Sequence, residues 1–274
     1  MTDALAPALR AFLAEGRPVA IVTVSEAKGS TPREAGATML VTVDATRGSI
    51  GGGQLELLAI SKARELLQHG SASAELNVPL GPKIGQCCGG HVSVTIASGA
   101  AQALPDLEAA DRAAAKARPT VLVFGAGHVG RALAKALSLL PFQVRWIDER
   151  ETEFGASAVG DNVEIIVTQR WSDEVRGAPA DAAYVVLTHS HSLDSMIVSA
   201  VLERGEFAYC GLIGSQTKRK VFESAFRDIG IPEASIARLV CPIGDRGVDD
   251  KRPEVIAALV AAELIEVFAQ RALK

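Results

Sequence analysis

Aromatic side chains and positive charge are both scarce in this sequence of 274 residues. Phe, Trp and Tyr make up 4% of the chain, and the formal net charge is -4. A chain without excess positive charge has little to neutralise a nucleic-acid backbone or an anionic membrane surface. Few aromatic rings also leave little surface on which unpaired bases stack. We therefore expect neither nucleic acid nor a membrane as a partner.

Long hydrophobic runs and cysteines are also few. No apolar run approaches the roughly 18 residues that are needed to span a bilayer. The stretch "MTDALAPALRAFLAEG" contains an early acid and no long apolar core, so we interpret it as an amphipathic helix and not as a signal peptide. The cysteines are Cys87, Cys88, Cys210 and Cys241. Without a signal peptide, so few cysteines predict free thiols in a reducing cytoplasm.

The length of the chain suits two domains. Residues 1–98 mix short β-patterned stretches with helical spacing, which predicts an α+β domain. Residues 99–118 contain nine alanines and almost no large apolar side chain, so we interpret them as a connection between domains. In residues 119–274, runs rich in Val and Ile alternate with helical segments, as in a parallel sheet with crossover helices. The predicted fold is α/β, an N-terminal α+β domain followed by a Rossmann-type doubly wound parallel-sheet domain.

The stretch "VLVFGAGHVGRALAKAL" carries the motif G-x-G-x-x-G at Gly125, Gly127 and Gly130. The motif follows an apolar strand, opens a helix and precedes Asp148 at the end of the next strand, which is the context of a dinucleotide-binding fingerprint. The three glycines, His128 and Asp148 are therefore candidate cofactor-binding residues. Asp148 suits a ribose diol and repels a 2′-phosphate, which favours NAD over NADP if the ligand is a nicotinamide. Alternatively, the glycines serve packing alone and the fold binds nothing.

The stretches "LTHSHSLD", "GLIGS" and "CPIG" each end a predicted strand of the second domain. In open α/β sheets the ligand crevice lies at the carboxyl ends of the strands, so we expect these loops to gather at one edge. His189, Gly214 and Ser215 are the residues that we expect to contact a ligand there. His189, His191 and Asp194 also carry metal-ligating groups, but two histidines separated by one residue at the end of a strand point to opposite faces. We therefore expect no metal site.

Two stretches of the first domain are rich in glycine. In "KGSTPREAGATM", Arg33 follows a proline and is suited to bind a phosphate or carboxylate through two hydrogen bonds, with a solvated surface charge as the alternative. In "GSIGGGQLE", a glycine run leads into a predicted helix, so its amides form a second candidate anion site. Glycine is costly unless the backbone needs its freedom. Gly52, Gly53 and Gln54 therefore join Arg33 as candidate binding residues.

A third glycine-rich stretch, "GPKIGQCCGG", carries the adjacent thiols of Cys87 and Cys88. Neighbouring side chains on an extended chain point to opposite sides, so this pair makes a poor metal chelate or a strained disulfide. The surrounding glycines instead predict a backbone that approaches a ligand closely. We interpret the segment as a ligand-facing thiol loop, with inert thiols as the alternative.

Taken together, these stretches resemble the XdhC/CoxI family, the accessory proteins of xanthine dehydrogenase and related molybdenum hydroxylases. "GSTPREAGATM", "GSIGGGQLE" and the thiol loop are similar to the N-terminal domain of that family. "VFGAGHVG", "LTHSHSLD", "GLIGSQTKR" and "CPIG" followed by "PEVIAALVAAEL" are similar to its Rossmann-type C-terminal domain. The resemblance covers nearly the whole chain. One departure is Ser190, where the family pattern leads us to expect an acidic residue, and this weakens the metal-site interpretation further.

The resemblance implies a cofactor-binding chaperone rather than an enzyme. It implies that the protein binds molybdenum cofactor in its molybdopterin form, supports the replacement of an oxo ligand by sulfur, and delivers the cofactor to apo xanthine dehydrogenase or a related hydroxylase. A cysteine desulfurase is the implied sulfur donor, and a homodimer is the implied assembly. Under this interpretation the thiol loop faces the pterin phosphate or the dithiolene, and Cys87 or Cys88 lies near the molybdenum or carries sulfur transiently.

Two other functions fit the same motifs. The glycine fingerprint and Asp148 equally suit NAD in a nicotinamide-dependent oxidoreductase, although no histidine or lysine motif obviously addresses a carbonyl group. A regulatory protein whose Rossmann domain senses nucleotide levels is the other alternative. In both, NAD or another nucleotide occupies the glycine loop.

Overall fold

The fold is known from a computed structural model, which describes residues 4–80, 89–155 and 159–273. The chain divides into two compact units, with the boundary between Lys116 and Ala117. Each unit has its own sheet and its own hydrophobic core. The thiol pair Cys87 and Cys88 lies outside the described residues.

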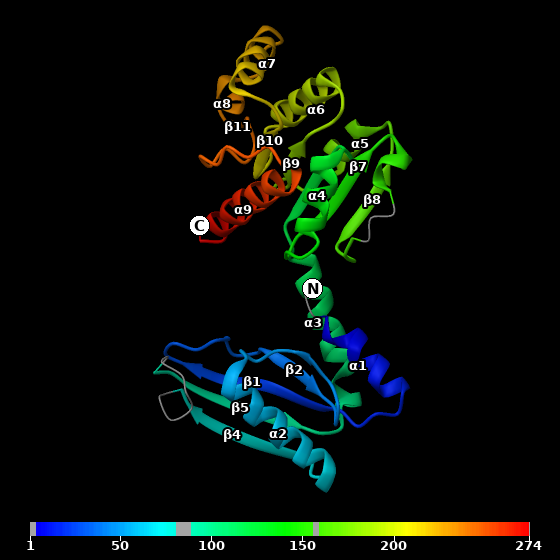
Figure 1. The fold of residues 1–274 in the computed structure, drawn as a ribbon, viewed down its shortest axis with the longest axis vertical. Helices are drawn as coiled ribbons and strands as arrows, with labels where there is room; N and C mark the ends of the chain where they lie inside the picture. Colours follow the sequence, from blue (N-terminus) through cyan, green and yellow to red (C-terminus); the bar gives the residue numbers. More distant parts are fainter. Residues whose placement is uncertain (1–3, 81–88, 156–158, 274) are drawn as a thin grey trace. The chain divides into compact units, whose positions relative to one another are not determined.

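An antiparallel sheet of five strands forms the framework of the first unit, in the order β3-β2-β1-β5-β4 (Figure 1). The strands are β1 (Ala20–Lys28), β2 (Thr38–Val41), β3 (Thr46–Gly48), β4 (Ser73–Pro79) and β5 (His91–Ala97). Every second side chain of β5 is buried, because alternate residues of a strand point to opposite faces. The buried side chains of β5 therefore all point to the same face of the sheet, and a long helix covers that face.

Helices pack on both faces of this sheet. α2 (Gly53–His69) covers one face with a stripe of alanine and leucine that repeats at helical spacing. α1 (Leu5–Ala14) covers the other face with the 3-10 helix η2 (Ala100–Ala103) and α3 (Leu104–Lys116). The alanine-rich segment that we interpreted as a connection is thus helical as far as Lys116. It belongs to the first unit, because Leu104 and Leu107 pack on the small core around α1.

A parallel sheet of six strands forms the framework of the second unit, in the order β11-β10-β9-β6-β7-β8. The strands are β6 (Thr120–Phe124), β7 (Gln143–Asp148), β8 (Val163–Val167), β9 (Ala183–Val186), β10 (Tyr209–Leu212) and β11 (Leu239–Val240). This is the doubly wound order of a Rossmann fold, with the reversal of direction between β6 and β9. Ligands of such sheets bind outside the carboxyl ends of the strands at that reversal.

Helices also cover both faces of the parallel sheet. α4 (His128–Leu137) and α9 (Pro253–Ala272) lie side by side on one face (Figure 1). The other face carries α5 (Trp171–Gly177), α6 (His191–Arg204), α7 (Gln216–Asp228) and α8 (Glu233–Ile236), and a 3-10 helix, η3 (Glu151–Phe154), follows β7. Side chains of β6 alternate between the two cores, so the strand reads as a continuous apolar run in the sequence.

The predicted fold class is confirmed, with an antiparallel sheet in the first unit and a Rossmann-like parallel sheet in the second. Among the described residues, no helix combines the length and the apolar character that crossing a bilayer requires.

We expect Cys210 and Cys241 to resist a maleimide while the protein is folded. Cys210 lies in β10 and is fully buried, and burial raises the pKa of its thiol to about 12, so thiolate is scarce at neutral pH. Burial also raises the pKa of Cys241, in spite of the nearby Lys218. Mass spectrometry after brief labelling should find both thiols unmodified in native protein and modified in urea. Rapid labelling of either thiol in the native state would contradict this burial.

Candidate functional site at the carboxyl ends of the parallel strands

The three glycines between β6 and α4 have different surroundings. Gly125 has a φ of +119°, and a Cβ atom placed on it would lie 2.3 Å from the carbonyl oxygen of Leu187. A Cβ atom on Gly130 would lie 2.0 Å from the carbonyl oxygen of Gly125. Gly127 is the N-cap of α4, and a Cβ atom there would meet no atom of a described residue within 4 Å beyond its immediate neighbours. Packing therefore requires Gly125 and Gly130, whereas Gly127 leaves the helix N-terminus open to a ligand.

The carboxylate of Asp148, at the end of β7, holds this glycine loop. Its Oδ2 accepts hydrogen bonds from the amide of Ala126 at 2.7 Å and from Nη2 of Arg150 at 2.9 Å. Its Oδ1 accepts hydrogen bonds from the amide and the Nε of Arg150, both at 3.0 Å. These bonds use about as many lone pairs as a carboxylate offers. A ribose diol would therefore have to displace Arg150 or the Ala126 amide.

The same contacts set the charge of Asp148. Burial alone disfavours the carboxylate, but the hydrogen bonds from Arg150 and Ala126 outweigh burial and lower the pKa of Asp148 below its ordinary value. The hydrogen bond to Asp148 in turn raises the pKa of Arg150. Both groups are therefore charged at neutral pH, and the pair is a fixed part of the loop.

A second buried carboxylate joins the loops after β9 and β10. Asp194, in the first turn of α6, accepts hydrogen bonds on Oδ1 from the amide and the hydroxyl of Thr188 at 3.0 and 2.7 Å. Its Oδ2 accepts a hydrogen bond from Nζ of Lys218 at 2.8 Å, and the same Nζ donates to the carbonyl of Ile213 at 3.0 Å. A buried charge needs such partners. Asp194 is therefore committed to holding the loops together.

Gly214 and Ser215 lie at the start of α7, beside this ion pair. The Oγ of Ser215 caps the helix by accepting a hydrogen bond from the amide of Lys218 at 3.2 Å. A Cβ atom on Gly214 would lie 2.7 Å from Cδ of Lys218 and 3.3 Å from Sγ of Cys241. Capping and close packing thus account for both residues without a ligand.

A cavity of about 100 Å³ opens where β6, β7, β8 and β9 end, and Gly125, Asp148 and His189 line it together. Nε2 of His189 lies 4.0 Å from Oε1 of Glu149, which also lines the cavity. Three predicted residues that are far apart in the sequence therefore meet at the reversal of the sheet, where an open α/β fold binds its ligand.

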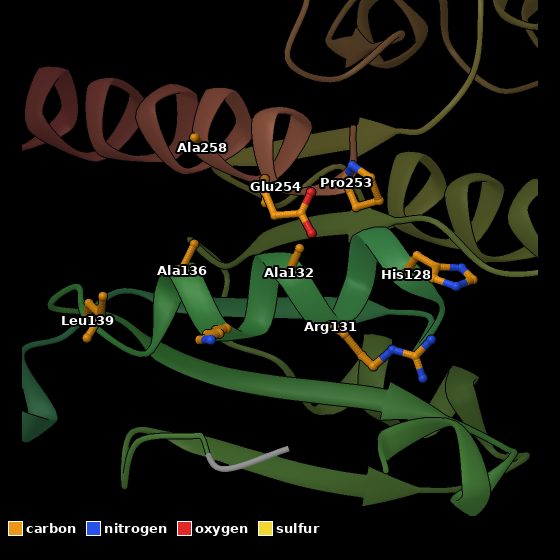
Figure 2. Close-up of a pocket in the computed structure, with 10 residues that line it drawn as sticks. His128, Arg131, Ala132, Ala136, Leu139, Pro253, Glu254 and Ala258 are labelled. Atoms are coloured by element: carbon orange, nitrogen blue, oxygen red, sulfur yellow. The ribbon is translucent and has the colours of Figure 1, made fainter. Parts of the chain in front are cut away.

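A larger hollow of about 830 Å³ lies in the groove between α4 and α9. Figure 2 shows His128 and Arg131 toward the N-terminal end of α4, with Pro253 and Glu254 of α9 across the groove. Alanines of both helices line the space between them. His128 therefore lines this groove and not the cavity at the strand ends.

In the first unit, three successive glycines, Gly51, Gly52 and Gly53, have positive φ values, so the glycine run is a requirement of the backbone. The carboxylate of Glu56, one turn into α2, accepts hydrogen bonds from the amides of Ile50 at 3.1 Å and Gly52 at 3.0 Å. An internal carboxylate therefore occupies two amides of the predicted anion site, in the manner of a helix-capping acid.

Arg33 is exposed in the loop between β1 and β2, and Gln54 is exposed in the first turn of α2. A Cβ atom on Gly51 would lie 2.6 Å from the ring of Pro32, so the loop that carries Arg33 packs on the glycine run. Ser30 and Gly89 form a single β-bridge, which brings the loop after β1 beside the residue that follows the thiol pair. The structure thus brings the loop that carries Arg33 to the glycine run that precedes Gln54.

The two units correspond, in order, to a known family. The model of the XdhC Rossmann domain matches residues 121–264, more than half of the chain, and the model of the XdhC and CoxI family matches residues 12–76. The chain belongs to the XdhC and CoxI family. The resemblance carried by the sequence motifs is therefore confirmed.

Two further proteins are similar to this XdhC and CoxI family chain. YqeB of Escherichia coli (strain K12), which is described as uncharacterized, is 28% identical over 258 residues. The match covers 91% of this chain and 43% of YqeB, so the chain spans less than half the length of that relative. A crystal structure described as a xanthine dehydrogenase from Bacillus halodurans superposes with a TM-score of 0.76 at 19% identity, over 99% of this chain and 97% of the other. That likeness is one of fold.

Sequence reasoning missed several residues that build the site in this family member. Glu56 stands four positions after the N-cap Gly52, one position beyond the capping-box spacing, so that motif does not mark it. Arg150 stands two positions after Asp148, so its bond is local, whereas no local signal marks Lys218, because its role depends on a carboxylate that the fold brings to it. Within the described residues, no group of three or more His, Cys, Asp and Glu side chains is placed to hold a metal ion.

We expect Gly130→Ala and Gly127→Ala to differ in stability, because the backbone packs closely around Gly130 and leaves space beside Gly127. Gly130→Ala should destabilise the second unit by about 2 kcal/mol or more, because its methyl group overlaps the backbone of Gly125. Gly127→Ala should leave the stability unchanged or raise it by up to about 1 kcal/mol. Urea unfolding followed by tryptophan fluorescence checks both, since Trp146 and Trp171 both lie in the second unit. Equal stability of the two variants would refute the packing role of Gly130.

Proposed function

We propose that this protein binds molybdenum cofactor as its cargo, supports sulfuration of the cofactor, and delivers it to apo xanthine dehydrogenase or a related molybdenum hydroxylase. The observation that carries the proposal is the match of both family models, in order, along one chain. A cysteine desulfurase is the proposed sulfur donor, and a homodimer is the proposed assembly. The protein acts as a carrier that holds and presents the cofactor.

The open side of the glycine loop supports binding of the phosphate of the cofactor. The first amides of α4 have no partner within the helix and carry partial positive charge. Among the described residues, none outside the immediate neighbours of Gly127 lies within 4 Å of a Cβ atom placed there, so there is space for a ligand beside the start of α4. Arg131 adds a guanidinium group from the first turns of α4, and its side chain is 33% exposed. The donor set of this loop therefore fits a phosphate ester.

The surroundings of Asp148 weigh against the alternative of an NAD-dependent oxidoreductase. A nicotinamide dinucleotide uses the acid at this position to accept hydrogen bonds from its ribose. Here Arg150 and Ala126 already donate four hydrogen bonds to that carboxylate. A ligand that carries its phosphate to the glycine loop without a ribose diol at Asp148 fits this arrangement better.

The loops at one edge of the antiparallel sheet support a role for the first unit in handling sulfur. Arg33 and the glycine run lie at the edge from which the thiol loop departs after Leu80 and to which the chain returns at Gly89. Cys87 and Cys88 therefore stay the proposed carriers of sulfur or neighbours of the molybdenum.

We expect Gly127→Val to weaken cofactor binding without unfolding the protein. The backbone of Gly127 is extended, with φ of -67° and ψ of -170°, so valine fits the conformation, but its side chain fills the space that a phosphate needs. Affinity for molybdopterin should fall at least tenfold, which corresponds to about 1.4 kcal/mol. Anaerobic titration calorimetry with molybdopterin measures this change, and a parallel titration with NAD tests the alternative.

Gly177→Val is the matched control for this experiment. Gly177 ends α5, and a Cβ atom there also meets nothing within 4 Å. This variant should bind molybdopterin like the wild type. If folded Gly127→Val also binds like the wild type, the glycine loop does not hold the phosphate, and tight binding of NAD instead would favour the nucleotide-dependent alternatives.

We expect the double variant Cys87→Ser, Cys88→Ser to fold normally and to lose function. It should retain less cofactor after purification, or activate apo xanthine dehydrogenase less, because the thiols that face the cofactor are gone. The bound pterin is measured by fluorescence after oxidation, and activation is measured as recovered dehydrogenase activity. In native protein, a maleimide should modify these two thiols before Cys210, and bound cofactor should protect them. If the double variant binds the cofactor and activates the dehydrogenase like the wild type, the two thiols have no role in the proposed function. The glycines of the same loop would keep theirs.

A further inference from the structure

The parallel sheet has two edges, and they differ in length. At one edge β11 (Leu239–Val240) pairs through two residues only. At the other edge β8 (Val163–Val167) pairs along its whole length with β7 (Figure 1). Among the described residues of the second unit, no strand pairs with the outer side of β8. Such an edge is a template on which a further strand can add, and proteins usually protect it.

The sequence of β8, VEIIV, lacks the residues that usually protect an edge. It contains neither proline nor lysine, and its pairing with β7 runs without a bulge. Its one charged residue, Glu164, lies 3.9 Å from Nε of Arg145 in β7. Two apolar side chains are exposed, Ile165 at 44% and Val167 at 48%. Strands of a parallel sheet are normally covered on both faces, so this exposure indicates that something else covers β8.

The backbone of β8 bonds to β7 through every second residue. The amide of Thr168, directly after the strand, donates a hydrogen bond to the carbonyl of Asp148 at 3.1 Å. Successive residues of a strand point their N–H and C=O groups to opposite sides, so the residues of even number bond to β7. Ile165 and Val167 therefore direct their N–H and C=O groups outward. Water or another strand must bond these groups.

We propose that β8 of a second copy of this chain pairs with β8 in antiparallel fashion, so that the two parallel sheets join across a two-fold axis. The register that matches the most apolar residues places Ile165 opposite itself and Val163 opposite the partner's Val167. Residues directly opposite in an antiparallel pair lie on the same face, so the exposed side chains of each copy cover those of the other. A register centred on Glu164 would oppose two like charges and is disfavoured.

Charges at the two ends of β8 favour the same pairing. Asp161 precedes the strand and Arg170 follows it, and both are exposed. Neither side chain forms an ion pair with any residue that the structure describes. Antiparallel pairing brings the start of one strand beside the end of the other, so Asp161 of each copy approaches the partner's Arg170. A homodimer is part of the proposed function, whereas the place of its interface rests on β8 and its flanking charges alone.

Sedimentation velocity of the full-length protein between about 1 and 100 μM tests the interface. The wild type should form a dimer of twice its mass of 28.6 kDa. Ile165→Lys should raise the dissociation constant of the dimer at least tenfold, because it sets two ammonium groups opposite each other. Val221→Lys is the matched control, since Val221 is 62% exposed on α7 and should dimerise like the wild type when substituted. Circular dichroism checks that both variants are folded.

A charge reversal separates the interface from general effects on folding. Asp161→Arg should weaken the dimer, because it brings two positive side chains together at each end of the paired strands. The double variant Asp161→Arg, Arg170→Asp should restore dimerisation, because the opposite charges then meet again with their positions exchanged. A variant that had merely lost stability would not be rescued in this way.

Cross-linking reports the register. In the Cys87→Ser, Cys88→Ser background, Ile165→Cys should form a disulfide between copies on mild oxidation, because opposite Cα atoms lie about 5.5 Å apart. Glu164→Cys should not, because residue 164 of each copy lies on a diagonal of about 7–8 Å from its equivalent. Non-reducing electrophoresis distinguishes the two.

The outcomes separate this interface from the proposed function. A protein that is monomeric at every concentration, or a dimer that Ile165→Lys leaves unchanged, would overturn the interface. A disulfide through Glu164→Cys in place of Ile165→Cys would overturn the register and with it the proposal. If the protein nevertheless purifies with molybdenum cofactor, the carrier role stands without this interface.

Discussion

The hydrogen bond from the Ala126 amide to the carboxylate of Asp148 joins the glycine loop to the end of β7. Two further bonds reinforce it, from the Gly125 amide to the Ile147 carbonyl and from the indole of Trp146 to the Gly125 carbonyl. The loop is thus held before any ligand arrives, and no binding energy is spent on ordering it. The start of α4, the opening at Gly127 and the wall of the cavity all depend on this attachment.

A second carboxylate extends the same principle to the neighbouring loops. Asp194 connects the loop after β9 with α7 through Thr188 and Lys218, and it does so while buried. Leaving such a charge without its partner costs several kcal/mol, so the two loops are coupled. The carboxyl edge of the parallel sheet is therefore a preorganised frame whose polar groups largely bond to one another.

This use of polar groups leaves neither buried acid free to bind a ligand. Asp148 and Asp194 are acids at the position where a Rossmann enzyme binds cofactor and substrate, yet both are committed to amides and cations of their own chain. A general acid or base must reach the proton that it moves. At the rim of the cavity, Oε1 of Glu149 and Nε2 of His189 lie 4.0 Å apart.

The sequence by itself determined the fold class and the place of the site. Period-two and continuous apolar runs predict the two kinds of sheet, and G-x-G-x-x-G predicts the glycine turn between a strand and a helix, because these signals are local. Only the tertiary structure decided which candidates are free to bind. The bond of Asp148 to Ala126, the bond of Asp194 to Lys218, and the approach of Glu149 to His189 each join residues that are far apart in the sequence. Such contacts depend on how the chain packs, and no periodicity in the sequence encodes them.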